Sequence, residues 1–350
     1  MRILYIGDAS PRSTSLQRAN ALKRMGHDVT VLAIKEALPE HRIISSWNVR
    51  TGFRFTSAVY ADYILKSAQQ CEVDLVWINH GAECSAQVVK ELKRRFGRII
   101  NYNTDDPFGS RDLNKWRLYR DALPHYDLTV VVRPINVSEA RALGASEVMR
   151  VWMTADEVAH APRVLGPEDV ERYQSQVLFI GDWMPERGPF MAELIRRGVP
   201  LTLCGARWDK APEWSTLAPH WRPSVFGDAY AMHIQSAAVC LGLLSKGNRD
   251  QHTTRSAEIP YLGGLLLAER TEEHLAMYRE NEEAVFWDDP ESCAARCFEL
   301  LAAPDRRRTI ANAGRRRALN SGYTNEVVLG RILAQVQQLP HGGESAGSRS

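Results

Sequence analysis

The stretch ILYIGDASPRSTSLQRANALKRMGHDVTVLA, residues 3–33, decides the fold class. Its apolar run over residues 3–6 predicts a buried strand, and after a polar loop the pattern predicts a helix from about Leu16 to Met25. Gly26 is typical of a helix end, and the apolar alternation of residues 28–34 predicts a second strand. A strand, a helix and a strand in this order make up the unit of a parallel sheet.

Further strand patterns at residues 74–79, 98–103 and 128–132 alternate with helical patterns, so the N-terminal half is expected to be a doubly wound α/β domain. Residues 159–176 are polar and contain two prolines, which indicates a linker. We therefore expect an N-terminal Rossmann-like acceptor domain over residues 1–165, a C-terminal Rossmann-like donor domain over residues 175–338, and a disordered tail over residues 340–350.

The segment FIGDWMPERGPFMAELIRRGVPLTLCG, residues 179–205, repeats the layout of the start of the chain. Both run from an apolar strand into Ile-Gly-Asp, then Pro and Arg, then a helix ending in basic residues and Gly, and then a strand. The alternative is a coincidence between two ordinary strand-helix-strand units. A true repeat predicts two Rossmann-like halves whose strand ends face a shared cleft.

Composition excludes several classes of function. The 44 Lys and Arg residues nearly balance the 42 Asp and Glu residues, so no overall field attracts nucleic acid or membrane. The six cysteines form no C-x-x-C pair, which favours reduced core thiols and a cytoplasmic location. No signal-peptide core and no membrane-spanning run is present. Residues 306–308 and 315–317 are all Arg, and this basic helix predicts a solvated face or, as the alternative, peripheral contact with an anionic membrane.

Residues that follow the predicted strands are candidates for ligand binding. Neither strand-to-helix loop has the G-x-G-x-x-G spacing of a dinucleotide site. Arg187 and Gly188 begin a helix and are expected to hold a diphosphate, although a surface arginine fits the same spacing. Arg255 supplies a cation for phosphate and Glu258 a carboxylate for sugar hydroxyls. The alternative for these two is an internal helix pair worth only about 0.2–0.5 kcal/mol.

Other candidates rest on residue type and position. Trp208 and Tyr230 offer an aromatic face or polar edge to a nucleotide base, although both residue types are commonly found in cores. His80 and the pair Asp105 and Asp106 follow strands of the first half and are candidate catalytic groups. The two aspartates also fit a turn before Pro107.

The second half resembles the donor domain of GT-B fold glycosyltransferases, in particular the CgeB-like spore-maturation group of family 1-type enzymes. The resemblance is carried by FIGDWMPERG, LCGARW, VFGDAYAMHIQSAAVCLGL, RSAEIPYLGG and NEEAVFWDDPESCAARCFELL, and it extends into the first half through NYNTDDPFG and residues 126–162. It implies a GT-B architecture with a nucleotide-diphospho-sugar in the cleft, its diphosphate near Arg187 and its ribose near Glu258. Related retaining enzymes carry Glu, seven residues, Glu, where this chain has Asp250 and Glu258.

The resemblance implies a nucleotide-sugar-dependent glycosyltransferase that retains anomeric configuration, with Asp250 at the sugar-binding acidic position. An inverting reaction would instead take its base from His80, Asp105 or Asp106. Fixed cations suffice to stabilise the leaving diphosphate, so we expect neither a metal nor a cofactor beyond the donor. The acceptor is left open among a glycan, a lipid-linked molecule, a protein and a small molecule. Two alternatives are a non-catalytic nucleotide-sugar-binding or surface-assembly protein and a sugar-nucleotide epimerase of the same fold.

Overall fold

The structure is a computed structural model that describes residues 1–39, 41–112 and 114–340. The chain folds into two compact units. The first unit contains Met1–Trp152, Gly247–Arg249 and the chain from Asn325 onward, and the second contains Met153–Lys246 and Asp250–Thr324. The predicted tail, apart from Pro340, lies outside the described residues.

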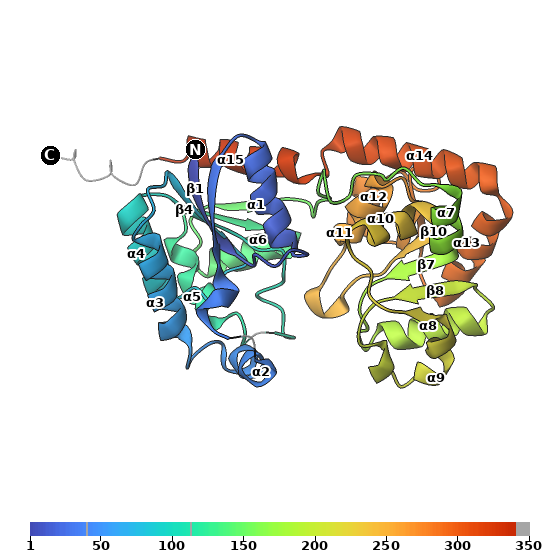
Figure 1. Ribbon diagram of the computed structural model, residues 1–350, viewed down its shortest axis with the longest axis horizontal. Helices are drawn as coiled ribbons and strands as arrows, with labels where there is room; N and C mark the ends of the chain where they lie inside the picture. The colour runs from blue at the N-terminus through green and yellow to red at the C-terminus, as the bar shows by residue number, and fades with distance from the viewer. Residues whose placement is uncertain (40, 113, 341–350) are drawn as a thin grey trace. The chain divides into compact units, whose positions relative to one another are not determined.

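The first unit is built on a parallel six-stranded sheet of order β2-β1-β3-β4-β5-β6 (Figure 1). Its strands are β1 (Arg2–Gly7), β2 (Asp28–Ala33), β3 (Leu75–Asn79), β4 (Ile99–Tyr102), β5 (Leu128–Val131) and β6 (Val148–Arg150). Its helices are α1 (Thr14–Arg24), α2 (Arg42–Thr51), α3 (Ser57–Ala68), α4 (Ala86–Phe96), α5 (Arg117–Ala122), α6 (Pro134–Ala142) and α15 (Asn325–Gln338). The strands predicted from the apolar runs are therefore confirmed, and β6 is an addition.

Local sequence explains how this unit begins. Ser13 caps α1, because its hydroxyl accepts a hydrogen bond from the Leu16 backbone N–H at 3.0 Å. The strand that precedes α1 is almost entirely buried and pairs with β2 on one side and β3 on the other, in the registers Ile3 to Val29 and Ile3 to Leu75. Burial on both faces accounts for its unbroken apolar run.

The second unit repeats this architecture with a parallel sheet of order β12-β11-β10-β7-β8-β9. Its strands are β7 (Ser175–Ile180), β8 (Leu201–Cys204), β9 (Trp221–Arg222), β10 (Ala237–Gly242), β11 (Leu266–Glu269) and β12 (Val285–Trp287). Its helices are α7 (Pro167–Tyr173), α8 (Arg187–Arg196), α9 (Trp214–Leu217), α10 (Gly227–Ser236), α11 (Thr254–Tyr261), α12 (Glu272–Met277), α13 (Pro290–Ala302) and α14 (Pro304–Ser321). In the first unit the first strand, β1, pairs with β2 and β3, and in the second unit the first strand, β7, pairs with β8 and β10.

The bounds of the units differ from the predicted domains at three places, of which the shortest is Gly247–Arg249, a part of the first unit. Residues 153–165 belong to the second unit, where the Arg163 guanidinium pairs with Asp228 of α10 at 2.8 Å. Helix α15 belongs to the first unit, where it packs along α1 and Glu326 pairs with Arg24 at 2.6 Å (Figure 1). Side-chain partners far away in the sequence therefore decide where these two segments belong.

One helix of the second unit contains a proline near its end. Pro260 in α11 has no N–H to donate, so the helix cannot complete the bond to the Ser256 carbonyl. The Tyr278 hydroxyl donates to that carbonyl at 2.7 Å and satisfies it. All six cysteines are free thiols, and five of them are buried, as expected for core residues.

Candidate functional site

The second unit has its topological switch point at β7 and β10, which are neighbours in the sheet. In open α/β sheets ligands bind beyond the carboxyl ends of the strands at such a point. Residues 181–186 follow β7 and residues 243–253 follow β10. Backbone packing is tight here, since a Cβ atom at Gly205 would lie only 2.0 Å from the Gly181 carbonyl oxygen. These two loops bring most of the predicted donor residues to one edge of the sheet.

Arg187 is the first residue of α8 and is almost fully buried. One terminal nitrogen donates to the Asp182 carbonyl at 2.7 Å, and the guanidinium lies 5.5 Å from the centre of the Phe179 ring. Its Nε atom is buried and has no hydrogen-bond partner among the described residues. Burial lowers the pKa of Arg187, and the nearby positive charge of Arg255 acts in the same direction. A buried cation with an unsatisfied donor fits an anionic ligand.

Arg255 and Glu258 lie one turn apart on α11 and form an ion pair of 2.7 Å. Glu258 is buried, and its Oε2 atom also accepts from the Tyr230 hydroxyl at 2.5 Å. The Arg255 guanidinium lies 5.0 Å from the centre of the Tyr230 ring. Burial would raise the pKa of Glu258, but the charges of Arg255 and His160 lower it below its usual value. Glu258 is therefore a carboxylate that holds Arg255 and Tyr230 in place.

His160 is a member of this cluster that sequence reasoning missed. Its Nε2 atom lies 3.5 Å from the second oxygen of Glu258, and its ring packs edge-on against Tyr230 at 5.8 Å between centres. His160 is in the polar segment that was interpreted as a linker. No pattern in the sequence marks it, because its partners lie 70 and 98 residues further along the chain.

Asp250 lies in the loop after β10. Its backbone N–H donates to the Ser245 carbonyl at 3.2 Å, and its Oδ2 atom accepts from the Ser245 N–H at 3.3 Å, so the residue closes a tight loop. The negative charge of Asp250 opposes the lowering of the Arg187 pKa. Asp250 therefore belongs to the same charged neighbourhood as Arg187 and Arg255.

Two other predicted donor residues have structural roles. Trp208 has no exposed surface and donates from its indole N–H to the Gly181 carbonyl at 3.0 Å. A Cβ atom at Gly188 would lie 2.4 Å from a carboxylate oxygen of Glu213, so the Glu213 side chain packs closely against this glycine. Both residues shape the β7 loop, and the side chain of Trp208 offers no surface to a nucleotide.

The first unit gathers another set of polar groups at the carboxyl ends of β3 and β4. His80 follows β3 with a positive φ of 73°, a backbone strain that often accompanies function. Its Nε2 atom lies 2.8 Å from Asp105 Oδ2, and Lys115 Nζ lies 3.4 Å from the same oxygen. Burial would raise the pKa of Asp105, but the hydrogen bond from His80 and the charges of His80 and Lys115 lower it. The predicted pair of His80 and Asp105 thus forms a hydrogen-bonded dyad.

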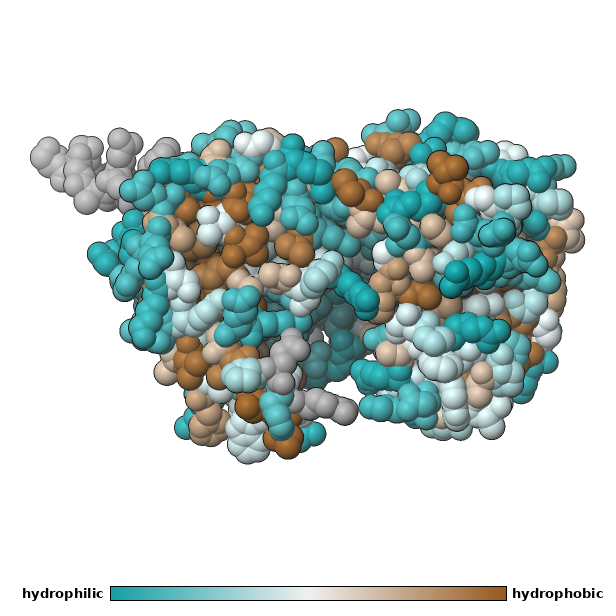
Figure 2. Space-filling model, viewed as in Figure 1, coloured by the Kyte–Doolittle hydropathy of each residue, from teal (hydrophilic) through white to brown (hydrophobic). Residues whose placement is uncertain are grey.

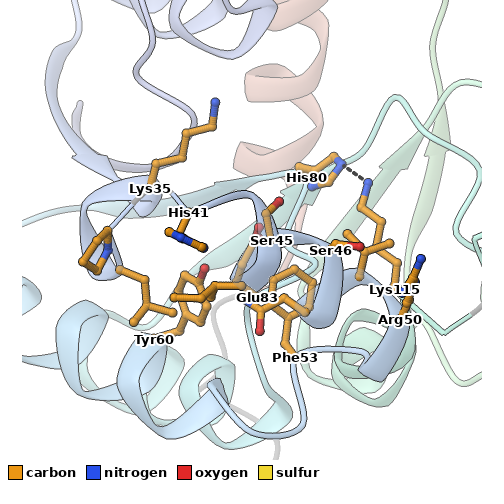
Figure 3. A pocket seen from close by; sticks show the side chains of 15 residues that line it. Lys35, His41, Ser45, Ser46, Arg50, Phe53, Tyr60, His80, Glu83 and Lys115 are labelled. Carbon is orange, nitrogen blue, oxygen red and sulfur yellow. Dashed lines mark hydrogen bonds between the residues drawn. The ribbon is translucent and has the colours of Figure 1, made fainter. Parts of the chain in front are cut away.

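His80 of this dyad borders a cavity of about 810 Å³ in the first unit, a volume in the range of small-molecule sites (Figure 3). Figure 3 shows Tyr60 of α3, Phe53 and the side chains of α2 around it. His80 and Lys115 line it, with Lys115 Nζ 3.4 Å from His80 Nε2. Lys115 was not singled out from the sequence, since a lone lysine in a loop carries no pattern.

Asp106, the neighbour of Asp105, has a different environment. Its side chain has no exposed surface and accepts from Arg249 at 2.5 and 2.7 Å and from the Asn136 amide at 3.0 Å. It also accepts from the backbone N–H of Gly109 at 3.1 Å. All these partners belong to the first unit. Asp106 therefore acts as a buried anchor, and a substrate has no access to it in this conformation.

Most of the second unit matches the model of a known protein family. Residues 187–334 match the family model described as glycosyl transferase-like. The match includes Arg187, Tyr230, Asp250, Arg255 and Glu258, and the sequence-based prediction of a glycosyltransferase is confirmed at this level. No curated protein sequence matches the chain significantly.

Solved structures extend the likeness to both units. A sucrose-phosphate synthase from Thermosynechococcus elongatus superposes with a TM-score of 0.73 at 14% identity, covering 96% of this chain and 99% of the other. HepE from Anabaena, in complex with UDP and glucose, superposes with a TM-score of 0.69 at 11% identity, covering 97% of this chain and 100% of the other. A trehalose-6-phosphate synthase studied for glycosyltransfer with retention superposes with a TM-score of 0.65 at 12% identity, covering 97% of this chain and 100% of the other. The predicted GT-B fold is confirmed.

Two findings concern metal-binding groups and membrane-spanning helices. Among residues 1–39, 41–112 and 114–340, no group of three or more His, Cys, Asp or Glu side chains is arranged to hold a metal ion. In the same ranges, no helix is long and apolar enough to cross a membrane.

Proposed function

We propose that the protein transfers a sugar from a UDP-sugar to an acceptor hydroxyl. The observation that carries this proposal is the pair of Arg187 and Arg255 at the switch point of the glycosyl transferase-like domain, with the unsatisfied Nε atom of Arg187. Two cations at the carboxyl end of β7 suit a diphosphate. UDP is the nucleotide in the HepE complex, which supports UDP as the first donor to test. The motifs at 179–188 and 255–264 support the CgeB-like group.

In the proposed reaction the bond between the anomeric carbon and the β-phosphate oxygen breaks. Negative charge grows on the departing phosphate, and Arg187, Arg255 and the first N–H groups of α8 stabilise it. Glu258 is a positioning residue in this scheme, because its carboxylate is buried against Tyr230 and Arg255. Asp250 is proposed to accept hydrogen bonds from the sugar hydroxyls, as its acidic position in the motif suggests.

We further propose that the cavity of the first unit binds the acceptor. Its volume fits a small molecule, and His80 and Lys115 supply polar contacts at its border. The acceptor oxygen forms its bond to the anomeric carbon as the phosphate leaves, and its proton passes to the departing phosphate oxygen. This course retains the anomeric configuration of the sugar. The trehalose-6-phosphate synthase, which was studied for glycosyltransfer with retention and has a similar fold, supports this proposal. The dyad of His80 and Asp105 then orients the acceptor.

Nucleotide binding is the first test. Thermal unfolding is measured with UDP, GDP, dTDP and CDP for the wild type, Arg187→Gln and Arg196→Gln. Arg196 is the matched control, because it is an exposed arginine on the same helix that pairs with Glu193. A ligand at about 100 times its dissociation constant adds roughly 2.7 kcal/mol to the stability of the folded state. UDP is expected to stabilise the wild type and Arg196→Gln, and to stabilise Arg187→Gln far less.

Turnover is tested separately by incubating the protein with UDP-glucose and a panel of acceptors, and by assigning the anomeric configuration of the product by NMR. A product of inverted configuration would exclude the retaining course and make His80 the candidate base. Binding of UDP without transfer or hydrolysis would favour a non-catalytic nucleotide-sugar-binding protein. A change of the donor sugar in the absence of acceptor would favour an epimerase. Failure of all four nucleotides to stabilise the wild type would remove the main support for the donor site.

A further inference from the structure

Large apolar side chains are exposed in one short part of the first unit. The described residues include sixteen exposed large hydrophobic residues, and six of them lie between residues 43 and 59. These six are Ile43, Ile44, Trp47, Val49, Phe55 and Val59. Figure 2 shows hydrophobic side chains gathered where α2 lies in Figure 1. Isolated exposed hydrophobics need no explanation, but a cluster of this kind marks a contact surface.

Helix α2 presents part of this cluster on one face. Ile43 is 73% exposed and Trp47 is 55% exposed, and together with Arg50 they occupy positions i, i+4 and i+7. Neither Ile43 nor Trp47 lines the cavity described above. The indole of Trp47 lies 6.1 Å from the ring of Phe55, so the face continues into the segment before α3. In the described part of α2 only Asn48 is buried, so these apolar residues do not serve the core.

The segment that carries the cluster contains basic residues and no acidic one; Asp62, which follows it, pairs with Lys66 at 2.9 Å, and Glu83 lies at the adjoining cavity. Residues 41–61 contain Arg42, Arg50 and Arg54 and no acidic residue. Arg50 and Arg54 have no carboxylate partner among the described residues, and Arg54 lies 5.8 Å from the centre of the Phe55 ring. Arginines of α14 differ, since Arg306 pairs with Glu299 and Arg308 pairs with Asp305. The unpaired cations of the α2–α3 region are therefore available to an anionic partner.

We propose that the α2–α3 face, defined by Ile43, Trp47, Arg50, Arg54, Phe55 and Val59, docks onto an anionic membrane surface. Trp and Phe are suited to the boundary between lipid headgroups and acyl chains, and arginines beside them attract anionic headgroups. Charge complementarity selects this occupant over a neutral apolar partner. Arg50 of this face also lines the cavity, as do Ile44 of α2 and Tyr60 of α3, so docking brings the membrane to the proposed acceptor site. The docking itself does not depend on the proposed function.

The test is co-sedimentation of the full chain with vesicles of phosphatidylcholine alone and of equal parts phosphatidylcholine and phosphatidylglycerol. Three double variants are compared with the wild type: Trp47→Ser with Phe55→Ser, Arg50→Ser with Arg54→Ser, and the control Phe298→Ser with Arg316→Ser. Phe298 of α13 and Arg316 of α14 are exposed residues of the second unit. Since each basic side chain near an anionic surface strengthens binding about fivefold, the loss of two should weaken binding about 30-fold.

The wild type and the control pair are expected to sediment with the anionic vesicles, and both α2–α3 variants are expected to stay in solution. Trp47 should also report insertion, because a blue shift of fluorescence on adding vesicles should disappear in Trp47→Phe. Absence of the wild type from the anionic pellet, or equal loss of binding in the control pair, would overturn the proposal. UDP binding by each variant is measured in parallel by calorimetry, so a failure of docking is distinguished from a failure of the donor site or of folding.

Discussion

Glu258→Ala is the substitution for which the structure makes the most detailed prediction. The carboxylate is buried, accepts hydrogen bonds from the Tyr230 hydroxyl and from Arg255, and faces His160 at 3.5 Å. Its removal leaves a buried hydroxyl and a guanidinium without their acceptor. Removing one partner of a fully buried pair costs about 3–5 kcal/mol. The Arg255 side chain is 31% exposed and can be hydrated in part, so we expect the low end of this range, about 3 kcal/mol.

The assay is urea unfolding of the wild type, Glu258→Ala, Tyr230→Phe and the double variant, together with UDP titration by calorimetry. Tyr230→Phe removes one hydrogen bond to a charged group and should cost about 1.5 kcal/mol. In Glu258→Ala the buried Tyr230 hydroxyl has already lost its acceptor, so removing the hydroxyl costs nothing further and the double variant should be at least as stable as Glu258→Ala. The reasoning is refuted if Glu258→Ala keeps the urea midpoint of the wild type and loses only UDP affinity, since Glu258 would then be a direct ligand contact.

Three further predictions concern other parts of the molecule. His80→Ala should lower kcat/KM for the acceptor at least about tenfold and leave the dissociation constant of UDP unchanged, because the dyad lies in the first unit; loss of UDP affinity in this variant would contradict the assignment. EDTA should leave initial rates with UDP-glucose unchanged, and restoration of a lost rate by Mg²⁺ would show that the two arginines do not suffice. Burial lowers the pKa of His274 from 6.5 to about 4, so between these values the unfolded chain binds a proton that the folded chain does not. The free energy of unfolding should therefore fall by at most roughly 3 kcal/mol as pH falls from 6.5 towards 4. In His274→Gln the urea midpoint should lack this dependence on pH.

The sequence predicted the sheets well because their central strands are buried on both faces. Such strands appear as unbroken apolar runs, as in β1 and β3. The cap of α1 at Ser13 and the glycine after its end, Gly26, are local signals. Helix α15 follows the basic helix α14 in the chain. Its place in the first unit depends on its packing against α1, which is about 300 residues away in sequence, and no local pattern carries that information.

The candidate site was predicted only in part, for the same physical reason. Residue type and position after a strand selected both Asp105 and Asp106, which are adjacent in sequence. Their different roles follow from partners that the fold supplies: His80 and Lys115 for Asp105, and Arg249, 143 residues away, for Asp106. Partners likewise separate Trp208, which donates to the Gly181 carbonyl, from Tyr230, which lies beside Arg255, although both are buried and looked equivalent as aromatic candidates.

The internal repeat explains why only one of the two equivalent loops is proposed to bind a diphosphate. After β1, the Ser13 side chain caps α1, and Asp8 accepts from Ser10 and pairs with Lys35 at 2.8 Å. The polar groups of that loop are thus satisfied within the loop and its neighbours. After β7, by contrast, no side chain caps the start of α8, and the first helical residue is Arg187 with its unsatisfied Nε atom. We therefore propose that this backbone arrangement holds an anion in the second unit, where the start of the helix leaves donors to be satisfied by a ligand.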